Sequence, residues 1–270
     1  MIVAAAQFTS RPLDITANAA AVAELVRAAG RAGAELVVFP ELALSGYELG
    51  VADDPDRFAL TSDDERLTVI RETCRDVRAA ALVGGPGRTP QGTTISAFVY
   101  GPDGEPLTRY DKRHVTATER AAGFVPGTVD GRFRLGGTAF GIAICYDAHF
   151  PELAERAAAE GCHALLASSL YGSDPGQRER AAIMPALAER NGLYVVLANH
   201  LGPAGAYDAC GGSAIWAPDG TRVAECAGIS PGFVTAELSS VDRRSGPSLP
   251  CRLFPQAGKG FGEDTGDVHL

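Results

Sequence analysis

The sequence predicts an α/β fold, arranged as a four-layer α-β-β-α sandwich with two mixed sheets. Short apolar runs alternate with segments of helical periodicity, which is typical of β-α-β units with parallel strands. Hairpin signals, such as Gly-Pro-Asp-Gly at residues 101–104 and Ala-Pro-Asp-Gly at 217–220, add antiparallel strands. About a dozen short strands are too many for one open sheet, so we expect two sheets packed face to face with helices outside.

The predicted elements alternate along most of the chain. Helices are predicted at residues 14–33, 62–80, 151–160 and 175–191. Strands are predicted at residues 2–8, 36–39, 81–83, 93–100, 105–110, 133–135, 138–144, 164–168, 193–198 and 232–238, with a further hairpin over 213–225. Apolar residues without helical period define the strands, whereas Ala, Leu and Val at helical spacing define the helices.

Capping and breaking residues set the ends of these elements. Pro40 halts the strand at residues 36–39. Ser62 is expected to cap the helix over residues 62–80, because acidic residues follow it at the positive end of the helix. We interpret Gly-Gly-Pro-Gly at residues 84–87 as the turn that ends a strand, since it lacks the spacing of a nucleotide-binding loop.

One domain over residues 1–244 is expected, because 270 residues lie near the upper end of what one hydrophobic core supports. The segment at residues 245–270 is rich in Gly and Pro and lacks periodicity. We interpret this segment as a C-terminal arm that is extended or takes part in dimerisation.

Composition and charge exclude several classes of function. The formal net charge of −9 argues against nucleic acid and anionic lipid as partners, because both require a positive patch. The N-terminus has no basic region, and no apolar run reaches the length of a membrane span, so we expect a cytoplasmic protein. The six cysteines form no C-x-x-C pair, which disfavours a structural zinc site or a thioredoxin-type redox site.

Three reactive side chains follow predicted strands, and ligands gather at the carboxyl ends of strands in parallel α/β sheets. Glu41 stands in an apolar neighbourhood, where burial raises a carboxyl pKa toward that of a general base. Cys145 lies at a strand-to-helix junction, where backbone amides stabilise a thiolate and an oxyanion. Lys112 follows the strand at residues 105–110. Taken alone, a lysine at this position is usually a solvated surface charge.

The sequence around these residues resembles the nitrilase superfamily of carbon–nitrogen hydrolases, on its amidase and carbamoylase branch. The resemblance is carried by three blocks that occur in the order of the family, namely FPELALSGY at residues 39–47, YDKRH at 110–114 and GIAICYDAHFPE at 141–152. It continues in AERN at residues 188–191, VVLAN at 195–199 and GSAI at 212–215. One block could arise by chance, but three in order are specific.

The resemblance implies a Glu-Lys-Cys triad of Glu41, Lys112 and Cys145 that hydrolyses a small amide through a cysteine thioester, with water and without metal or organic cofactor. Glu119, before FVPG at residues 124–127, is the implied second glutamate, which orients the lysine and the substrate. The backbone amide of Tyr146 is implied as an oxyanion donor. The family also implies a homodimer or a higher homo-oligomer.

The acyl-side preference is less defined by the sequence. Ser169 and Leu170 follow the next strand and are expected to line the substrate site. Relatives that bind a substrate carboxylate often carry arginine shortly after Cys-Tyr-Asp, whereas this chain has Ala148 and His149. That difference weakens the case for an α-carboxylated substrate. N-carbamoyl compounds and nitriles remain open as substrates.

Three other readings compete with this one. A Cys-His hydrolase would use His149, His114 or His200 as its base. A catalytically silent scaffold on the same fold would lack a triad member, and none is missing. An acyltransferase, which passes the thioester to an amine, is also compatible with the sequence.

Overall fold

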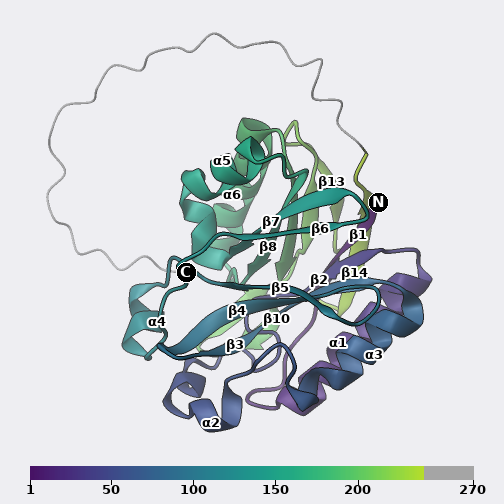
Figure 1. Ribbon diagram of the computed structural model, residues 1–270. Helices are drawn as coiled ribbons and strands as arrows, with labels where there is room; N and C mark the ends of the chain where they lie inside the picture. The colour runs from purple at the N-terminus through teal and green to yellow at the C-terminus, as the bar shows by residue number, and fades with distance from the viewer. Residues whose placement is uncertain (240–270) are drawn as a thin grey trace, which may run out of the picture.

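Two six-stranded sheets lie face to face between two layers of helices (Figure 1). The computed structural model describes residues 1–239. One sheet has the order β14-β1-β2-β3-β4-β5 and the other β13-β12-β9-β8-β7-β6. Each sheet has a parallel centre and antiparallel edges. The predicted four-layer α-β-β-α sandwich with two mixed sheets is therefore confirmed.

The elements have the following bounds. The strands are β1 Ile2–Gln7, β2 Leu36–Val38, β3 Ala80–Thr89, β4 Gly92–Tyr100, β5 Pro106–Asp111, β6 Gly131–Leu135, β7 Thr138–Ile144, β8 Ala164–Ser169, β9 Tyr194–Asn199, β10 Leu201–Ala204, β11 Tyr207–Cys210, β12 Ala214–Trp216, β13 Arg222–Glu225 and β14 Gly232–Glu237. The helices are α1 Ile15–Arg31, α2 Pro55–Phe58, α3 Thr68–Val77, α4 Ala117–Ala121, α5 Pro151–Ala159 and α6 Gly176–Asn191, with 3-10 turns η1 Leu49–Asp53, η2 Glu65–Leu67 and η3 Cys145–His149.

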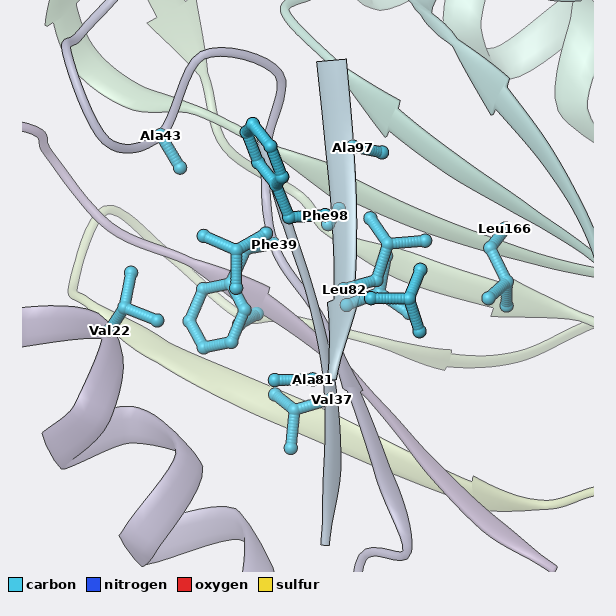
Figure 2. Packing of buried hydrophobic residues seen from close by; sticks show 14 of the residues in the cluster. Val22, Val37, Phe39, Ala43, Ala81, Leu82, Ala97, Phe98 and Leu166 are labelled. Carbon is cyan, nitrogen blue, oxygen red and sulfur yellow. The ribbon is translucent and has the colours of Figure 1, made fainter. Parts of the chain in front are cut away.

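The main hydrophobic core fills the space between the sheets and beneath α1. Figure 2 shows Leu82 of β3 and Phe98 of β4 in this cluster, with Val22 of α1 and Leu166 of β8 at its sides. All four side chains are fully buried. Burial of this apolar surface stabilises the sandwich and fixes the sheets that carry the site.

The second predicted helix begins later than expected. Ser62 does not cap it, because the helix α3 starts at Thr68 and is preceded by the 3-10 turn η2. Asp64 caps η2, since its side chain accepts a hydrogen bond from the Arg66 amide, whereas Leu67 at the start of α3 makes no side-chain capping bond. Three consecutive polar residues after Ser62 offered more than one capping carboxylate, and the sequence did not distinguish between them.

The Gly-Gly-Pro-Gly run at residues 84–87 is not the predicted turn. It lies inside β3, which pairs with β4 along its full length. A side chain at Gly84 would collide with the carbonyl oxygen of Pro40 and the amide of Leu42, the two neighbours of Glu41. The glycine therefore allows the segment that carries Glu41 to pack directly on β3.

None of the helices within residues 1–239 combines the length and the apolar character that a membrane crossing requires. The predicted C-terminal arm at residues 245–270 lies outside the described residues. The boundary of the domain at residue 244 stays a prediction.

Candidate active site

The structure brings Glu41, Lys112, Glu119 and Cys145 together in the interior. Glu41 follows β2, Lys112 follows β5, Glu119 lies in α4, and Cys145 begins η3 directly after β7. Glu41, Lys112 and Glu119 are fully buried, and Cys145 is 1% exposed. Four side chains from three parts of the chain thus share one buried site, and burial strengthens the electrostatic interactions between them.

Lys112 links the two carboxylates. Its Nζ donates to Glu41 Oε1 at 2.7 Å and to Glu119 Oε1 at 2.6 Å. Its backbone is held as well, because the Lys112 amide donates to Ile95 O and its carbonyl accepts from the Gly127 amide, both at 2.8 Å. A side chain at Gly127 would collide with the carbonyl of residue 111, so the glycine of the FVPG segment is required there.

Glu119 is fixed by its own helix. The capping box at the start of α4 places Glu119 Oε2 at 2.8 Å from the Thr116 amide, while the Thr116 hydroxyl accepts from the Glu119 amide. The other oxygen, Oε1, accepts from Tyr47 Oη at 2.6 Å as well as from Lys112. Since both oxygens are occupied, this carboxylate is suited to holding Lys112 rather than to exchanging protons.

Glu41 is less completely bonded than Glu119. Its Oε2 is buried, and no donor among the described residues satisfies hydrogen-bond geometry there. The Cys145 thiol is nevertheless close enough to favour the charged carboxylate. Oε2 is therefore the oxygen of Glu41 that is left open to a donor.

The backbone of Cys145 is strained. Cys145 has a φ of +47°, in the left-handed region that favours glycine. This conformation turns the chain from β7 into η3 and directs the thiol toward Leu170 O, which lies 3.6 Å from Sγ. Strained backbone of this kind costs about 1–3 kcal/mol and is concentrated at functional sites.

Burial and charge set the protonation states in the site. Burial raises the pKa of Glu41 to about 7, against the opposing effect of Lys112. Burial, together with the charge of Glu41, also raises the pKa of the Cys145 thiol well above its ordinary value. Burial alone would lower the pKa of Lys112, but the charges of Glu41, Cys145 and Glu119 raise it above its ordinary value. At neutral pH the site therefore holds a thiol, an ammonium group and a Glu41 side chain that is partly deprotonated, and its carboxylate form accepts a proton.

Three further residues were predicted to bind or orient the substrate. Tyr146 is partly exposed and packs edge-on against Phe150. Ser169 is the last residue of β8, and its buried Oγ has no hydrogen-bond partner among the described residues. The backbone carbonyl of Leu170 accepts from the Cys145 thiol at 3.6 Å.

The three histidines considered as alternative bases have other partners. His114 Nδ1 lies 2.8 Å from Asp147 Oδ1, and the ring stacks on Phe150. His200 Nε2 contacts the backbone carbonyl of Glu41, and His149 Nε2 lies 3.5 Å from Glu179 Oε1. These arrangements favour Glu41 over a histidine as the base.

Asp147 is a buried residue that sequence reasoning did not assign to the site. Its Oδ1 accepts from the amide and the ring of His114, and its Oδ2 accepts from the Tyr110 hydroxyl and the Ile144 amide. Tyr110 and His114 flank Lys112 in sequence, so Asp147 joins the lysine segment to the cysteine turn. The signal was present in the spacing Y-x-K-x-H and C-Y-D, but the sequence did not show that the two blocks meet.

We expect Asp147→Asn to lower the free energy of unfolding by about 2–4 kcal/mol, because an amide nitrogen would face donors in a buried network. Chemical denaturation followed by circular dichroism measures this loss. Asp76→Asn on α3 is the matched control, since Asp76 is exposed. Equal stability of the two variants would contradict the role of Asp147 as a link between the blocks.

Comparisons with known proteins define the class to which this site belongs. The family model of carbon-nitrogen hydrolases matches residues 2–247. The chain belongs to this family, and the predicted membership in the nitrilase superfamily as an amidase-like carbon–nitrogen hydrolase is confirmed.

Individual relatives cover most of the chain. A protein from Pseudomonas protegens described as a hydrolase in the pqqF 5′ region is 31% identical over 88% of this chain and 82% of its own length. A deaminated glutathione amidase from Synechocystis is 28% identical over 94% of this chain and 98% of its own length. Among solved structures, an amidase from Nesterenkonia sp. AN1 is 30% identical with a TM-score of 0.80, over 90% of this chain and 96% of its own. That structure carries the product of Michael addition of acrylamide at its active-site cysteine.

Proposed function

We propose that the protein hydrolyses the C–N bond of a small amide through a thioester on Cys145, releasing ammonia or an amine and a carboxylic acid. The observation that carries this proposal is the buried bridge of Lys112 between Glu41 and Glu119, with the thiol beside it. Such a bridge holds a cation next to a nucleophile in a buried site. A cation placed in this way stabilises the oxyanion that forms when the nucleophile attacks a carbonyl group.

Acylation begins with proton transfer from the Cys145 thiol to Glu41. Sγ forms a bond to the substrate carbonyl carbon, and the carbonyl π electrons move onto oxygen. The Lys112 ammonium group and the backbone amide of Tyr146 stabilise this oxyanion. The oxyanion then collapses, the C–N bond breaks, and Glu41 returns its proton to the leaving nitrogen.

Deacylation uses Glu41 in a second pair of proton transfers. Glu41 takes a proton from water, and the hydroxide that forms attacks the thioester carbon. The C–S bond breaks, the carboxylic acid leaves, and the proton on Glu41 returns to the Cys145 thiolate. Glu119 keeps Lys112 in place through both steps. This sequence consumes one water per amide and requires no cofactor.

A small amide suits the site better than a bulky substrate. The four polar side chains are almost completely buried, so a large acyl group would have to displace packed residues. Structures of the Nesterenkonia amidase contain butyramide and acrylamide, which are short aliphatic amides. We therefore expect Ser169 and Leu170 to contact a short acyl chain.

Ammonia release tests the proposed reaction. The panel holds butyramide, acrylamide, benzamide, an N-carbamoyl amino acid and butyronitrile. We expect release from the two short amides, slower release from benzamide, and the least from the last two compounds. Release only from the N-carbamoyl compound or the nitrile would overturn the amide assignment, and transfer of the acyl group to hydroxylamine without hydrolysis would indicate an acyltransferase.

The value of kcat/KM should rise with pH through the pKa of Glu41, which is about 7. Only the deprotonated carboxylate accepts the thiol proton, so activity should fall about tenfold per pH unit below that value and level off above it. A pH profile with butyramide measures this limb. A profile that stays flat between about pH 5 and 8 would contradict Glu41 as the base.

The predicted homodimer or larger homo-oligomer stays part of the proposal. Sedimentation velocity would measure the assembly directly, and a monomer at micromolar concentration would refute it.

A further inference from the structure

Two buried polar side chains of one sheet bond to the backbone of the segment that carries Glu41 in the other sheet. Ser168, in β8, donates through its hydroxyl to the Phe39 carbonyl at 2.7 Å. His200 follows β9 and contacts the Glu41 carbonyl through Nε2. Both side chains are fully buried. The segment after β2 is therefore held across the interface between the two sheets.

The same segment also packs on β3 of its own sheet. The Phe39 amide donates to Leu82 O at 2.9 Å, and the Leu44 amide donates to Gly84 O at 3.0 Å. These backbone bonds hold the amides at the two ends of the segment. The carbonyl groups of residues 39 and 41 accept instead from Ser168 and His200, so the side chains of the other sheet complete the bonding of this segment.

The imidazole of His200 acts as a donor in this contact. A carbonyl oxygen only accepts hydrogen bonds, so Nε2 carries the proton. Burial lowers the pKa of His200 to about 4, so the imidazole is neutral at neutral pH and Nδ1 carries no proton. Nδ1 is buried with no partner among the described residues. Since an unpaired buried nitrogen destabilises a fold, the bond to Glu41 accounts for a histidine at this position.

The strands that carry Ser168 and His200 also hold the nucleophile. β8 pairs in parallel with β7, which leads directly into Cys145. At the end of β9, Asn199 Oδ1 accepts from the Tyr171 amide at 2.7 Å. The carbonyl of that same peptide group belongs to Leu170 and accepts from the Cys145 thiol. The ends of β8 and β9 thus define where the base lies relative to the thiol.

We infer that Ser168 and His200 are positioning residues, which hold the Glu41 carboxylate beside Lys112 by fixing the backbone of its segment. This inference rests on the proposed function, in which Glu41 is the base. Lys112 Nζ lies 2.7 Å from Glu41 Oε1, and a loosened segment would lengthen that distance. Both residues act through backbone carbonyl groups and exchange no proton with the substrate.

Substitutions of the two donors test the inference. His200→Leu removes the donor and keeps a side chain of similar size, so kcat for ammonia release from butyramide should fall about 10- to 100-fold, with KM within about twofold. His200→Gln, whose amide can donate to the same carbonyl, should recover part of the loss. Ser168→Ala should lower kcat by a smaller factor, and it carries the test if His200→Leu does not fold. A wild-type kcat in both His200→Leu and Ser168→Ala would overturn the inference.

The pH profile separates positioning from a loss of stability. Burial raises the pKa of Glu41 to about 7, Lys112 lowers it, Glu119 raises it, and the hydrogen bond from Cys145 lowers it. A carboxylate that moves away from Lys112 loses stabilisation of its charged form, so the acid limb of kcat/KM in His200→Leu should move to higher pH by about half a unit or more. A limb at the wild-type pH would overturn the inference, because a purely structural role changes only the amount of folded enzyme.

Tyr100→Phe is the matched control. Tyr100 is also fully buried, and its hydroxyl donates to the Ser62 carbonyl at 3.0 Å, before η2. The control loses the same kind of bond as Ser168→Ala, so denaturation should show a similar loss of stability, while kcat stays within about twofold of the wild type. If Tyr100→Phe lost as much kcat as Ser168→Ala, the effect would follow from any lost buried bond, and the inference would fail.

Crystal structures separate this inference from the proposed reaction. If the wild type releases ammonia from no amide, the proposed function fails, and the structures of the wild type and His200→Leu still compare the distance from Lys112 Nζ to Glu41 Oε1. An increase of about 1 Å or more in the variant would support positioning, because a shift of that size is enough to disable a catalytic group. An unchanged distance would reject it.

Discussion

Cys145→Ala should lower kcat for ammonia release by at least about 10³-fold while the fold is retained. The methyl group cannot form the bond to the carbonyl carbon, so only the oxyanion donors and the bound geometry remain to act on the substrate. The side chain is 1% exposed and small, and its removal leaves little empty volume. Ammonia release from butyramide, with circular dichroism to verify folding, measures the effect.

Cys226→Ala is the matched control. Cys226 is also largely buried and belongs to the same set of six cysteines, but its thiol lies 3.9 Å from the Ala5 carbonyl of β1. The control should retain activity within about twofold. If Cys145→Ala retained more than about a tenth of the wild-type rate, the nucleophile would have to be another residue.

Lys112→Met should be the most damaging single change for stability. Methionine fills similar volume, but the carboxylates of Glu41 and Glu119 would lose the cation that lies 2.7 and 2.6 Å from them. Removal of one partner from a buried ion pair typically costs about 3–5 kcal/mol. Denaturant titration should show a loss of this size at neutral pH, and a smaller loss at acidic pH, because protonated carboxyl groups need no counter-ion.

A second substitution separates stability from activity. Glu119→Gln in the Lys112→Met background removes one uncompensated carboxylate, so it should restore part of the stability without restoring ammonia release. Arg88→Met provides the surface control, because Arg88 and its partner Asp56 are 42% and 94% exposed and such pairs contribute about 0–1 kcal/mol. Equal losses for Lys112→Met and Arg88→Met would refute the buried bridge.

Most strands could be predicted from the sequence because the apolar runs are short and clearly bounded, although β3 continues to Thr89 and β10 and β11 were not predicted. Glu41 and Cys145 stood out for that reason, since each follows such a run. Lys112 did not, because a lysine after a hairpin strand has the same appearance whether it is buried or solvated. The burial of Lys112 depends on a contact between the two sheets. The edge strand β5 of one sheet lies against the turn that follows β7 of the other, and no local sequence pattern encodes that contact.

Long-range packing also explains what sequence reasoning missed. Asp147 joins the lysine and cysteine blocks, yet an aspartate in a C-Y-D run has several possible partners. The Gly-Gly-Pro-Gly run at residues 84–87 has the composition of a turn, but pairing with β4 makes it a strand, and the Glu41 segment that packs on it requires glycine at residue 84.

Labelling with fluoroacetamide tests the central claim, that Cys145 is a nucleophile held beside Lys112, most directly. A structure of the Nesterenkonia amidase contains the acetamide moiety of this reagent at its active-site cysteine. The Glu41→Gln variant is the protein to treat, because loss of Glu41 slows hydrolysis and removes a charge that raises the pKa of the thiol, while Lys112 still favours the thiolate. Sγ then displaces fluoride and forms a stable C–S bond.

Peptide mapping by mass spectrometry should find one acetamide group, on Cys145 and on none of the other five cysteines. The claim would be contradicted if another cysteine were labelled before Cys145, or if Cys145 stayed unlabelled.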